Sequence, residues 1–150
     1  MHSNSYARLG IMTVLSFISM YILMYAMVDR FANVYSSLNQ AYMAGLMTAP
    51  MVVIEVLLMG AMYENKTANV IIFCLGALAL IGFFALIRAQ TAITDRQFLR
   101  SMIPHHAGAI LMCAEAPIEA AGIKELCRKI IASQQQEIDE MKAKLSAITR

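Results

Sequence analysis

Charged side chains are scarce in this chain, at 15% of its 150 residues, where a typical soluble domain has roughly 25%. The net charge of +2 is too small to indicate binding to nucleic acid, so we predict no such partner. The three cysteines form no CxxC pair and no zinc-type spacing. A nucleophile elbow, a phosphate-binding loop and an oxyanion device are also missing, and we therefore predict that the protein is not an enzyme.

Long apolar runs fill the first part of the chain instead. Residues 9–28, 41–63 and 68–87 form three such runs, and Glu55 is the only charged residue within them. Each run reaches the length of about 20 residues that crosses a bilayer core of roughly 30 Å. A cleaved signal peptide has a shorter apolar region, of about 7–15 residues. We predict that residues 1–88 form three uncleaved transmembrane helices in contact with membrane lipid.

Glu55 and the methionines admit two interpretations. The chain has 13 methionines, and a series at spacing four runs through the second span: Met43, Met47, Met51, Glu55 and Met59. An ionisable residue within a span marks function by default, so these side chains could line a copper path. Methionine is also a flexible filler of apolar interiors, with Glu55 protonated and hydrogen-bonded to a neighbouring helix. We favour packing.

Beyond residue 88 the pattern becomes amphipathic, and residues 89–150 are predicted to form a helical hairpin. One arm spans residues 94–114, with Thr94 or Asp95 as its N-cap, and the other spans residues 123–148. Pro117 and Gly122 mark the connection. Pro104 lies within the first arm, where it either begins a helix or kinks a continuous one.

Two adjacent histidines are the most unusual feature of this hairpin. Met102, His105, Ala109 and Met112 follow one another at spacings of 3, 4 and 3, which places them on one helical stripe. His106 lies about 100° further round the helix. Imidazole and thioether are soft ligands that suit copper, and above all Cu(I).

Folding the hairpin brings further polar residues to the histidines. If the turn centres near residue 120, residues whose numbers sum to about 240 are level with one another. His105 and His106 then lie level with Gln134 and Gln135. Met102 comes level with Ile138, one turn or less from Glu137 and Met141. We therefore predict a metal site between the two arms.

The same register places Cys113 opposite Cys127. A disulfide between the two arms and a pair of reduced core thiols are both compatible with this placement.

These residues resemble the bacterial domain-of-unknown-function family numbered 305, which includes CopM-type copper-binding proteins. The family pattern is an Asp, a Phe, then Met-Ile-x-His-His-x-x-Ala-x-x-Met, followed on the next helix by Gln-x-x-Glu-Ile-x-x-Met. The matching positions in this chain are Asp95, Phe98, Met102, Ile103, His105, His106, Ala109, Met112, Gln134, Glu137, Ile138 and Met141. The match covers roughly residues 94–145, and the three spans lie outside it.

The resemblance implies a ferritin-like helical bundle that binds copper through histidine and methionine. Carried over by position, the metal ligands are Met102, His105, His106, Met112, Glu137 and Met141. Family members often carry two such hairpins, whereas this chain carries one. The fold expected is thus all-α, with three transmembrane helices followed by half of a ferritin-like four-helix bundle, which a homodimer completes.

We accordingly expect a multi-pass protein of the bacterial inner membrane that binds copper for sequestration, tolerance or transfer between donor and acceptor proteins. One alternative is a membrane-anchored dimerisation module with buried, metal-free histidines, and another is a small metal-dependent redox enzyme. Three spans put the N-terminus and the hairpin on opposite sides of the membrane. The positive-inside rule leans weakly to a cytoplasmic hairpin, the exported setting of the family leans the other way, and the side remains open.

Overall fold

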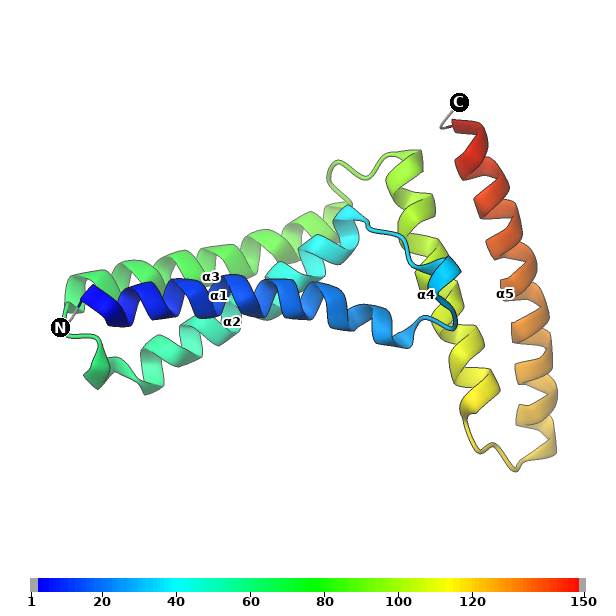
Figure 1. Cartoon of the computed structure of the whole chain (residues 1–150), viewed down its shortest axis with the longest axis horizontal. Helices are drawn as coiled ribbons and strands as arrows, with labels where there is room; N and C mark the ends of the chain where they lie inside the picture. The colour runs from blue at the N-terminus through cyan, green and yellow to red at the C-terminus, as the bar shows by residue number, and fades with distance from the viewer. Residues whose placement is uncertain (1–2, 149–150) are drawn as a thin grey trace. The chain divides into compact units, whose positions relative to one another are not determined.

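The computed structural model describes residues 3–148, and within that range it contains α- and 3₁₀-helices but no strand (Figure 1). The predicted all-α fold is confirmed. Two compact units divide the chain: one comprises the residues up to Met24 together with Asn39–Thr91, and the other comprises Tyr25–Leu38 together with the residues from Ala92 onward. The second unit therefore contains a segment that the sequence-based division at residue 88 assigns to the membrane region.

The first unit contains three long apolar helices, α1 (Ser3–Leu23), α2 (Leu38–Leu58) and α3 (Lys66–Ala89). Three stretches are long and apolar enough to cross a membrane: Ser5–Met27, Leu38–Leu58 and Lys66–Ala89. At most of their ends, the boundaries of these stretches agree with those of the predicted spans to within a few residues. The start of α3 is capped by Asn65, whose Oδ1 accepts a hydrogen bond of 3.0 Å from the backbone N–H of Ala68.

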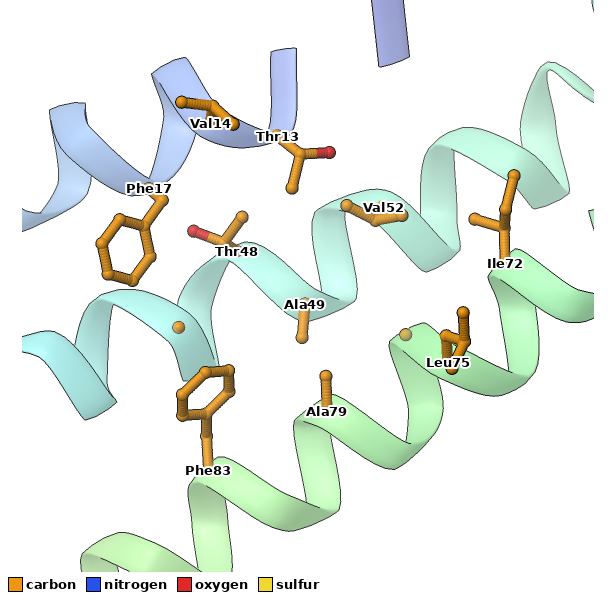
Figure 2. A pocket seen from close by; sticks show the side chains of 12 residues that line it. Thr13, Val14, Phe17, Thr48, Ala49, Val52, Ile72, Leu75, Ala79 and Phe83 are labelled. Atoms are coloured by element: carbon orange, nitrogen blue, oxygen red, sulfur yellow. The ribbon is translucent and has the colours of Figure 1, made fainter. Parts of the chain in front are cut away.

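Glycines allow α2 and α3 to approach each other closely. A Cβ added to Gly45 would lie 2.5 Å from Cζ of Phe83, and one added to Gly76 would lie 2.7 Å from Cγ2 of Val53. Small residues at helix contacts are typical of membrane proteins. Beside these contacts the three helices enclose an open groove of about 430 Å³ (Figure 2). Its lining is apolar apart from the hydroxyls of Thr13 and Thr48, and it carries no ionisable side chain.

Glu55 lies in the last turn of α2 and not in the middle of the span. Its Oε1 accepts a hydrogen bond of 3.3 Å from the hydroxyl of Tyr63, which follows the short 3₁₀-helix η3 (Gly60–Met62). The expected partner on a neighbouring helix is thus replaced by a residue from the loop after α2. Sδ of Met20 accepts a bond of 3.7 Å from the Thr48 hydroxyl, and Met12 packs in an apolar cluster. These contacts agree with packing methionines.

The second unit is built on two antiparallel helices, α4 (Asp95–Glu115) and α5 (Ala121–Ile148) (Figure 1). Thr94 caps α4, since its side chain accepts a hydrogen bond of 3.4 Å from the N–H of Gln97. Pro104 stands inside a continuous α4, so the helix does not begin or break there. The core between the helices consists of Leu99, Ile103, Ala107, Ile110, Ile138 and Leu145.

The segment Tyr25–Leu38 packs against this hairpin as a third element. It contains the end of the 3₁₀-helix η1 (Met24–Met27) and the whole of η2 (Phe31–Asn33). Val28 and Tyr35 pack on the hairpin core, and Gly108 approaches the Met27 carbonyl so closely that an added Cβ would lie 3.3 Å from its oxygen. If the three apolar helices each cross a membrane, this segment and the hairpin emerge on the same side, and their packing is consistent with that topology.

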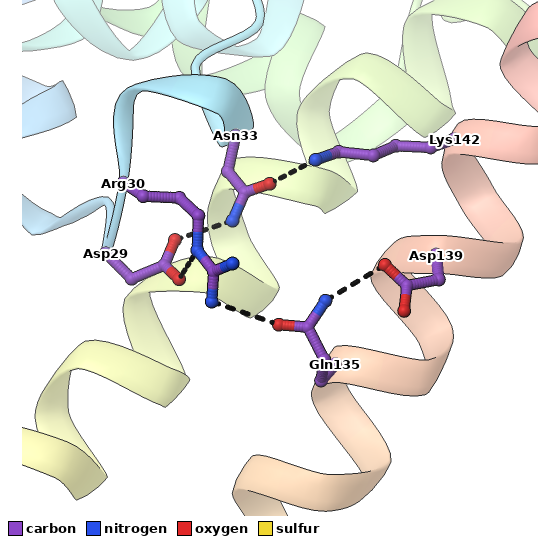
Figure 3. Close-up of polar contacts among 6 residues, drawn as sticks. All are labelled: Asp29, Arg30, Asn33, Gln135, Asp139 and Lys142. Atoms are coloured by element: carbon purple, nitrogen blue, oxygen red, sulfur yellow. Dashed lines mark hydrogen bonds and ion pairs between the residues drawn. The ribbon is translucent and has the colours of Figure 1, made fainter.

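Polar contacts centred on Asn33 hold the segment in place (Figure 3). The Asn33 side chain is buried, with 1% of its surface exposed. Its amide nitrogen donates to Asp29 Oδ1 at 2.6 Å, and its oxygen accepts from Lys142 Nζ on α5 at 2.6 Å. A second bond to α5 runs from Arg30 to Gln135 Oε1 at 3.3 Å. Both ends of the buried amide are therefore satisfied.

Candidate functional site

His106 and Glu137 connect the two helices of the hairpin. The Nε2 atom of His106 lies 2.7 Å from Glu137 Oε2. The histidine side chain is 10% exposed and the glutamate side chain 51%, so the pair lies at the edge of the core, with the carboxylate facing solvent. This is the convergence of the two arms that the sequence predicts.

The other ring nitrogen defines the protonation pattern of His106. Nδ1 lies 2.9 Å from the backbone carbonyl oxygen of Met102. Because a carbonyl oxygen only accepts hydrogen bonds, Nδ1 carries a proton. Nε2 and the Glu137 oxygen then share a second proton, because two lone pairs would repel each other at 2.7 Å. A histidine that binds a metal through one nitrogen commonly donates the other N–H to a backbone carbonyl or carboxylate.

The register of the hairpin brings two methionines next to this pair. Helices α4 and α5 are antiparallel and meet at His106 and Glu137. The residue one helical turn before His106 on α4 is therefore level with the residue one turn after Glu137 on α5. That step leads to Met102 on α4 and Met141 on α5, both half-buried. Met141 packs against the hairpin core. The backbone positions of Met102 and Met141 thus lie about one turn, or roughly 5.4 Å along the helix axes, from those of His106 and Glu137.

The remaining predicted ligands lie on the solvent side of α4. His105 is exposed, with its ring centre 6.0 Å from that of His106. Met112 is 54% exposed and lies almost two helical turns beyond His106. The structure therefore joins His106 to Glu137, places Met102 and Met141 about one helical turn from them along α4 and α5, and leaves His105 and Met112 exposed.

Glu137 is the α5 residue that bonds His106, where the sequence predicts Gln134 or Gln135 level with the histidines. Gln134 is half-buried, and Gln135 instead bonds Arg30 and Asp139. The offset from the prediction is three residues, close to one turn of helix. Sequence reasoning did not identify the Met102 carbonyl as a partner of His106, although the spacing of four residues between them on a helix could have suggested it.

Among residues 3–148, no three His, Cys, Asp or Glu side chains converge on a point that could hold a metal ion. Methionine thioethers are soft ligands of a different kind, and Met102 and Met141 lie about one helical turn from the His106–Glu137 pair. A metal held at this place by one chain would therefore depend on sulfur as well as on the His106–Glu137 pair.

Cys113 near the end of α4 forms a disulfide with Cys127 on α5. Of the two states that the sequence leaves open, the structure has the bonded one. The bridge closes the turn end of the hairpin, and the numbers of its two residues sum to 240, as the predicted register requires. Cys74, in α3, is a free and exposed thiol.

Comparisons with known proteins identify relatives of undescribed activity. The model of the family described as "Domain of unknown function (DUF305)" matches residues 83–145. The protein "Uncharacterized protein L153" of Acanthamoeba polyphaga mimivirus is 34% identical over 134 residues, which cover 87% of this chain and 86% of the viral protein. That similarity extends well beyond the residues of the family model. No solved structure matches the chain.

Proposed function

The chain belongs to the DUF305 family of domains of unknown function, and from this premise we propose that it is a membrane-anchored protein that binds copper, chiefly as Cu(I). Copper is its cargo, held for sequestration, tolerance or transfer between donor and acceptor proteins, and no turnover is involved. The membrane proposed is the inner membrane of a bacterium, and this part of the proposal rests on the family resemblance.

The observation that carries the proposal is the orientation of His106. Its Nδ1–H donates to the Met102 carbonyl at 2.9 Å, which holds the ring with Nε2 directed at Glu137, 2.7 Å away. A metal ion would take the place of the proton between these two atoms. The thioethers of Met102 and Met141 complete a soft donor set, which favours Cu(I) over magnesium or calcium.

The disulfide supports a location of the proposed copper site outside the cytoplasm. Disulfides persist in oxidising compartments and are rare in the cytosol. The Cys113–Cys127 bond therefore favours a hairpin on the extracytoplasmic side, with the N-terminus inside. A small excess of arginines near the hairpin favours the cytoplasmic side under the positive-inside rule. We give the disulfide more weight, because this excess is small. A membrane-impermeant thiol reagent, applied to intact cells after reduction, should label Cys113 and Cys127.

Copper binding is tested by competition of the full chain, in nanodiscs, with a chromophoric Cu(I) chelator. We expect His106→Ala to weaken binding about 10- to 100-fold, the effect of losing a ligand or its support. Met102→Leu and Met141→Leu should weaken Cu(I) binding with little change in fold, because leucine and methionine have similar volumes. His2→Ala and Met47→Leu serve as matched controls.

A wild-type protein that competes no better than its His106→Ala variant would overturn the proposal. The second candidate function would then apply: a metal-free interaction module in which the His106–Glu137 bond only locks α4 to α5. The observation favouring that candidate is that both ring nitrogens of His106 already have hydrogen-bond partners within the chain.

A further inference from the structure

A second groove, here called the α1 groove, runs along helix α1 within the first unit and has a volume of about 550 Å³. Its wall on α1 extends from Arg8 to Leu23, and Met51 of α2 also lines it. The α1 residues between these two ends recur at intervals of three and four, so all of them share one face of the helix. They are Ile11, Met12, Leu15, Ser16, Ser19 and Met20.

One end of the α1 groove is positively charged. In the lining that the structure describes, Arg8 is the one charged side chain, and it is exposed. Among residues 3–148, no hydrogen bond or ion pair engages its guanidinium group. Arginine binds phosphate through two parallel hydrogen bonds. The α1 groove therefore combines apolar walls with a cation that is available to a phosphate group, whereas the groove in Figure 2 has no ionisable lining.

Polar contacts beside Arg8 indicate that this end of the groove lies at the surface of the membrane. The Tyr6 hydroxyl donates a hydrogen bond of 2.8 Å to Oδ1 of Asn69, in the first turn of α3. Tyrosine is enriched at the interface between membrane and water, and an arginine near the end of a span extends its charged group to the same level. From there the groove continues into the apolar stretch Ser5–Met27, so Arg8 stands at the height of lipid headgroups.

The length of the α1 groove suits an acyl chain. The separation of Arg8 and Leu23 corresponds to about 22 Å along a helix, and half of a bilayer core is about 15 Å thick. A chain of the adjacent leaflet can therefore lie in the groove over its whole length while its headgroup stays beside Arg8. The volume of about 550 Å³ also falls within the range of roughly 300–1,000 Å³ that is typical of ligand sites.

We propose that the α1 groove binds one anionic phospholipid, with an acyl chain along α1 and the phosphate group paired with Arg8. A lipid of net negative charge is favoured over a zwitterionic one, because the guanidinium group repels the ammonium group of the latter. This inference concerns the three apolar helices and does not depend on copper. Its failure would leave the proposed copper function untouched, and the reverse also holds.

The headgroup site is tested by native mass spectrometry of the full chain in mild detergent, titrated with phosphatidylglycerol or with phosphatidylethanolamine. We expect one phosphatidylglycerol per chain, bound about fivefold more tightly than phosphatidylethanolamine, the effect of one basic residue near an anionic lipid surface. Arg8→Gln should abolish this preference. Lys66→Gln is the matched control, because it removes a cation at the start of α3 that does not line the groove, and it should keep the preference.

The acyl-chain site is tested by filling the groove. Ser19→Phe adds a large side chain at an exposed position of the lining, and we expect it to weaken binding of both lipids at least tenfold. Ile18→Phe is the control, because Ile18 is 47% exposed and lies outside the lining, and its lipid binding should match that of the wild type. Circular dichroism checks that the variants keep their helices.

Three results would overturn the proposal. Equal loss of the lipid preference in Arg8→Gln and Lys66→Gln would indicate general attraction of anionic lipid to basic residues. Unchanged lipid binding in Ser19→Phe would show that no acyl chain occupies the groove. A wild type that forms dimers which Ser19→Phe dissociates and Ile18→Phe does not would assign the groove to a helix of a second copy.

Discussion

His106 Nε2 and Glu137 Oε2 lie 2.7 Å apart although 31 residues separate them in the chain. This contact is the direct polar link between α4 and α5 at the level of the candidate site. A hydrogen bond to a charged group is stronger than a neutral one, but the exposed carboxylate moderates its contribution. The same two atoms thus bear on the stability of the hairpin and on its capacity to bind a cation.

Glu137→Gln should lower the stability of the hairpin by about 1 kcal/mol. The amide can still donate to His106, but the charge is lost. Thermal unfolding followed by circular dichroism measures the change. Glu140→Gln is the matched control, because its bond to Lys144 is an exposed i,i+4 pair worth about 0.3–0.5 kcal/mol. Equal losses of stability in the two variants would show that the His106–Glu137 contact stabilises the hairpin no more than an exposed ion pair does.

Acid should release the segment Tyr25–Leu38 from the hairpin. Burial by itself raises the pKa of Asp29, but hydrogen bonds from Asn33 and Arg30 and the charge of Arg30 outweigh it, so the pKa lies below its ordinary value. A carboxylate with a lowered pKa stabilises the folded state above its unfolded pKa of about 3.9 and loses this contribution as the pH falls through the folded value. Hydrogen exchange of the segment should therefore accelerate below about pH 4.

Asp29→Asn provides the control for that acid sensitivity. The variant should show faster exchange of the segment already at neutral pH, with a weaker dependence on acid. An exchange rate that rises with acid equally in both proteins would assign the sensitivity to other carboxylates.

Gly108→Val should weaken the docking of the same segment. An added Cβ meets the Met27 carbonyl oxygen at 3.3 Å, and the further methyl groups of valine require the backbone to move. Such overpacking typically costs about 1–3 kcal/mol. Valine has a slightly better helix propensity than glycine, so a loss of stability reports the clash. Ala114→Val, at an exposed position of α4, should leave exchange of the segment unchanged.

Gly45→Val should disturb the packing of α2 on α3. The added Cβ would lie 2.5 Å from the ring of Phe83, and the expected loss is again about 1–3 kcal/mol. Phe83→Ala in the same chain should restore part of it, measured as thermal unfolding in detergent. Gly82→Val is the control, since nothing lies within 4 Å of its added Cβ. Additive effects of the Gly45 and Phe83 substitutions would contradict a direct clash.

The sequence alone predicts the pairing of residues across the hairpin only to within about one helical turn. A turn centred near residue 120 correctly pairs Cys113 with Cys127. It places His106 level with Gln134, whereas the observed partner is Glu137. The difference is about one turn, because the rotation of each helix about its axis and the reach of its side chains determine which residue makes contact. Neither follows from residue numbering.

Segment Tyr25–Leu38 could not be assigned to the hairpin from its sequence. It is short, polar and without a periodic pattern, so it is predicted only as a connection between two spans. Its role depends on Asn33 and Lys142, which are 109 residues apart. A contact at that separation leaves no local signal in either stretch.

The sequence by itself determined the helices, since hydrophobic length specifies the three spans and amphipathic periodicity specifies the two arms of the hairpin. It also determined which residue types are available as soft ligands. Only the tertiary structure decided that His106 meets Glu137 while His105 remains exposed, because adjacent residues on a helix point about 100° apart and packing selects which of them faces the other helix. The disulfide and the docking of Tyr25–Leu38 were decided in the same way, by contacts between residues that only folding brings together.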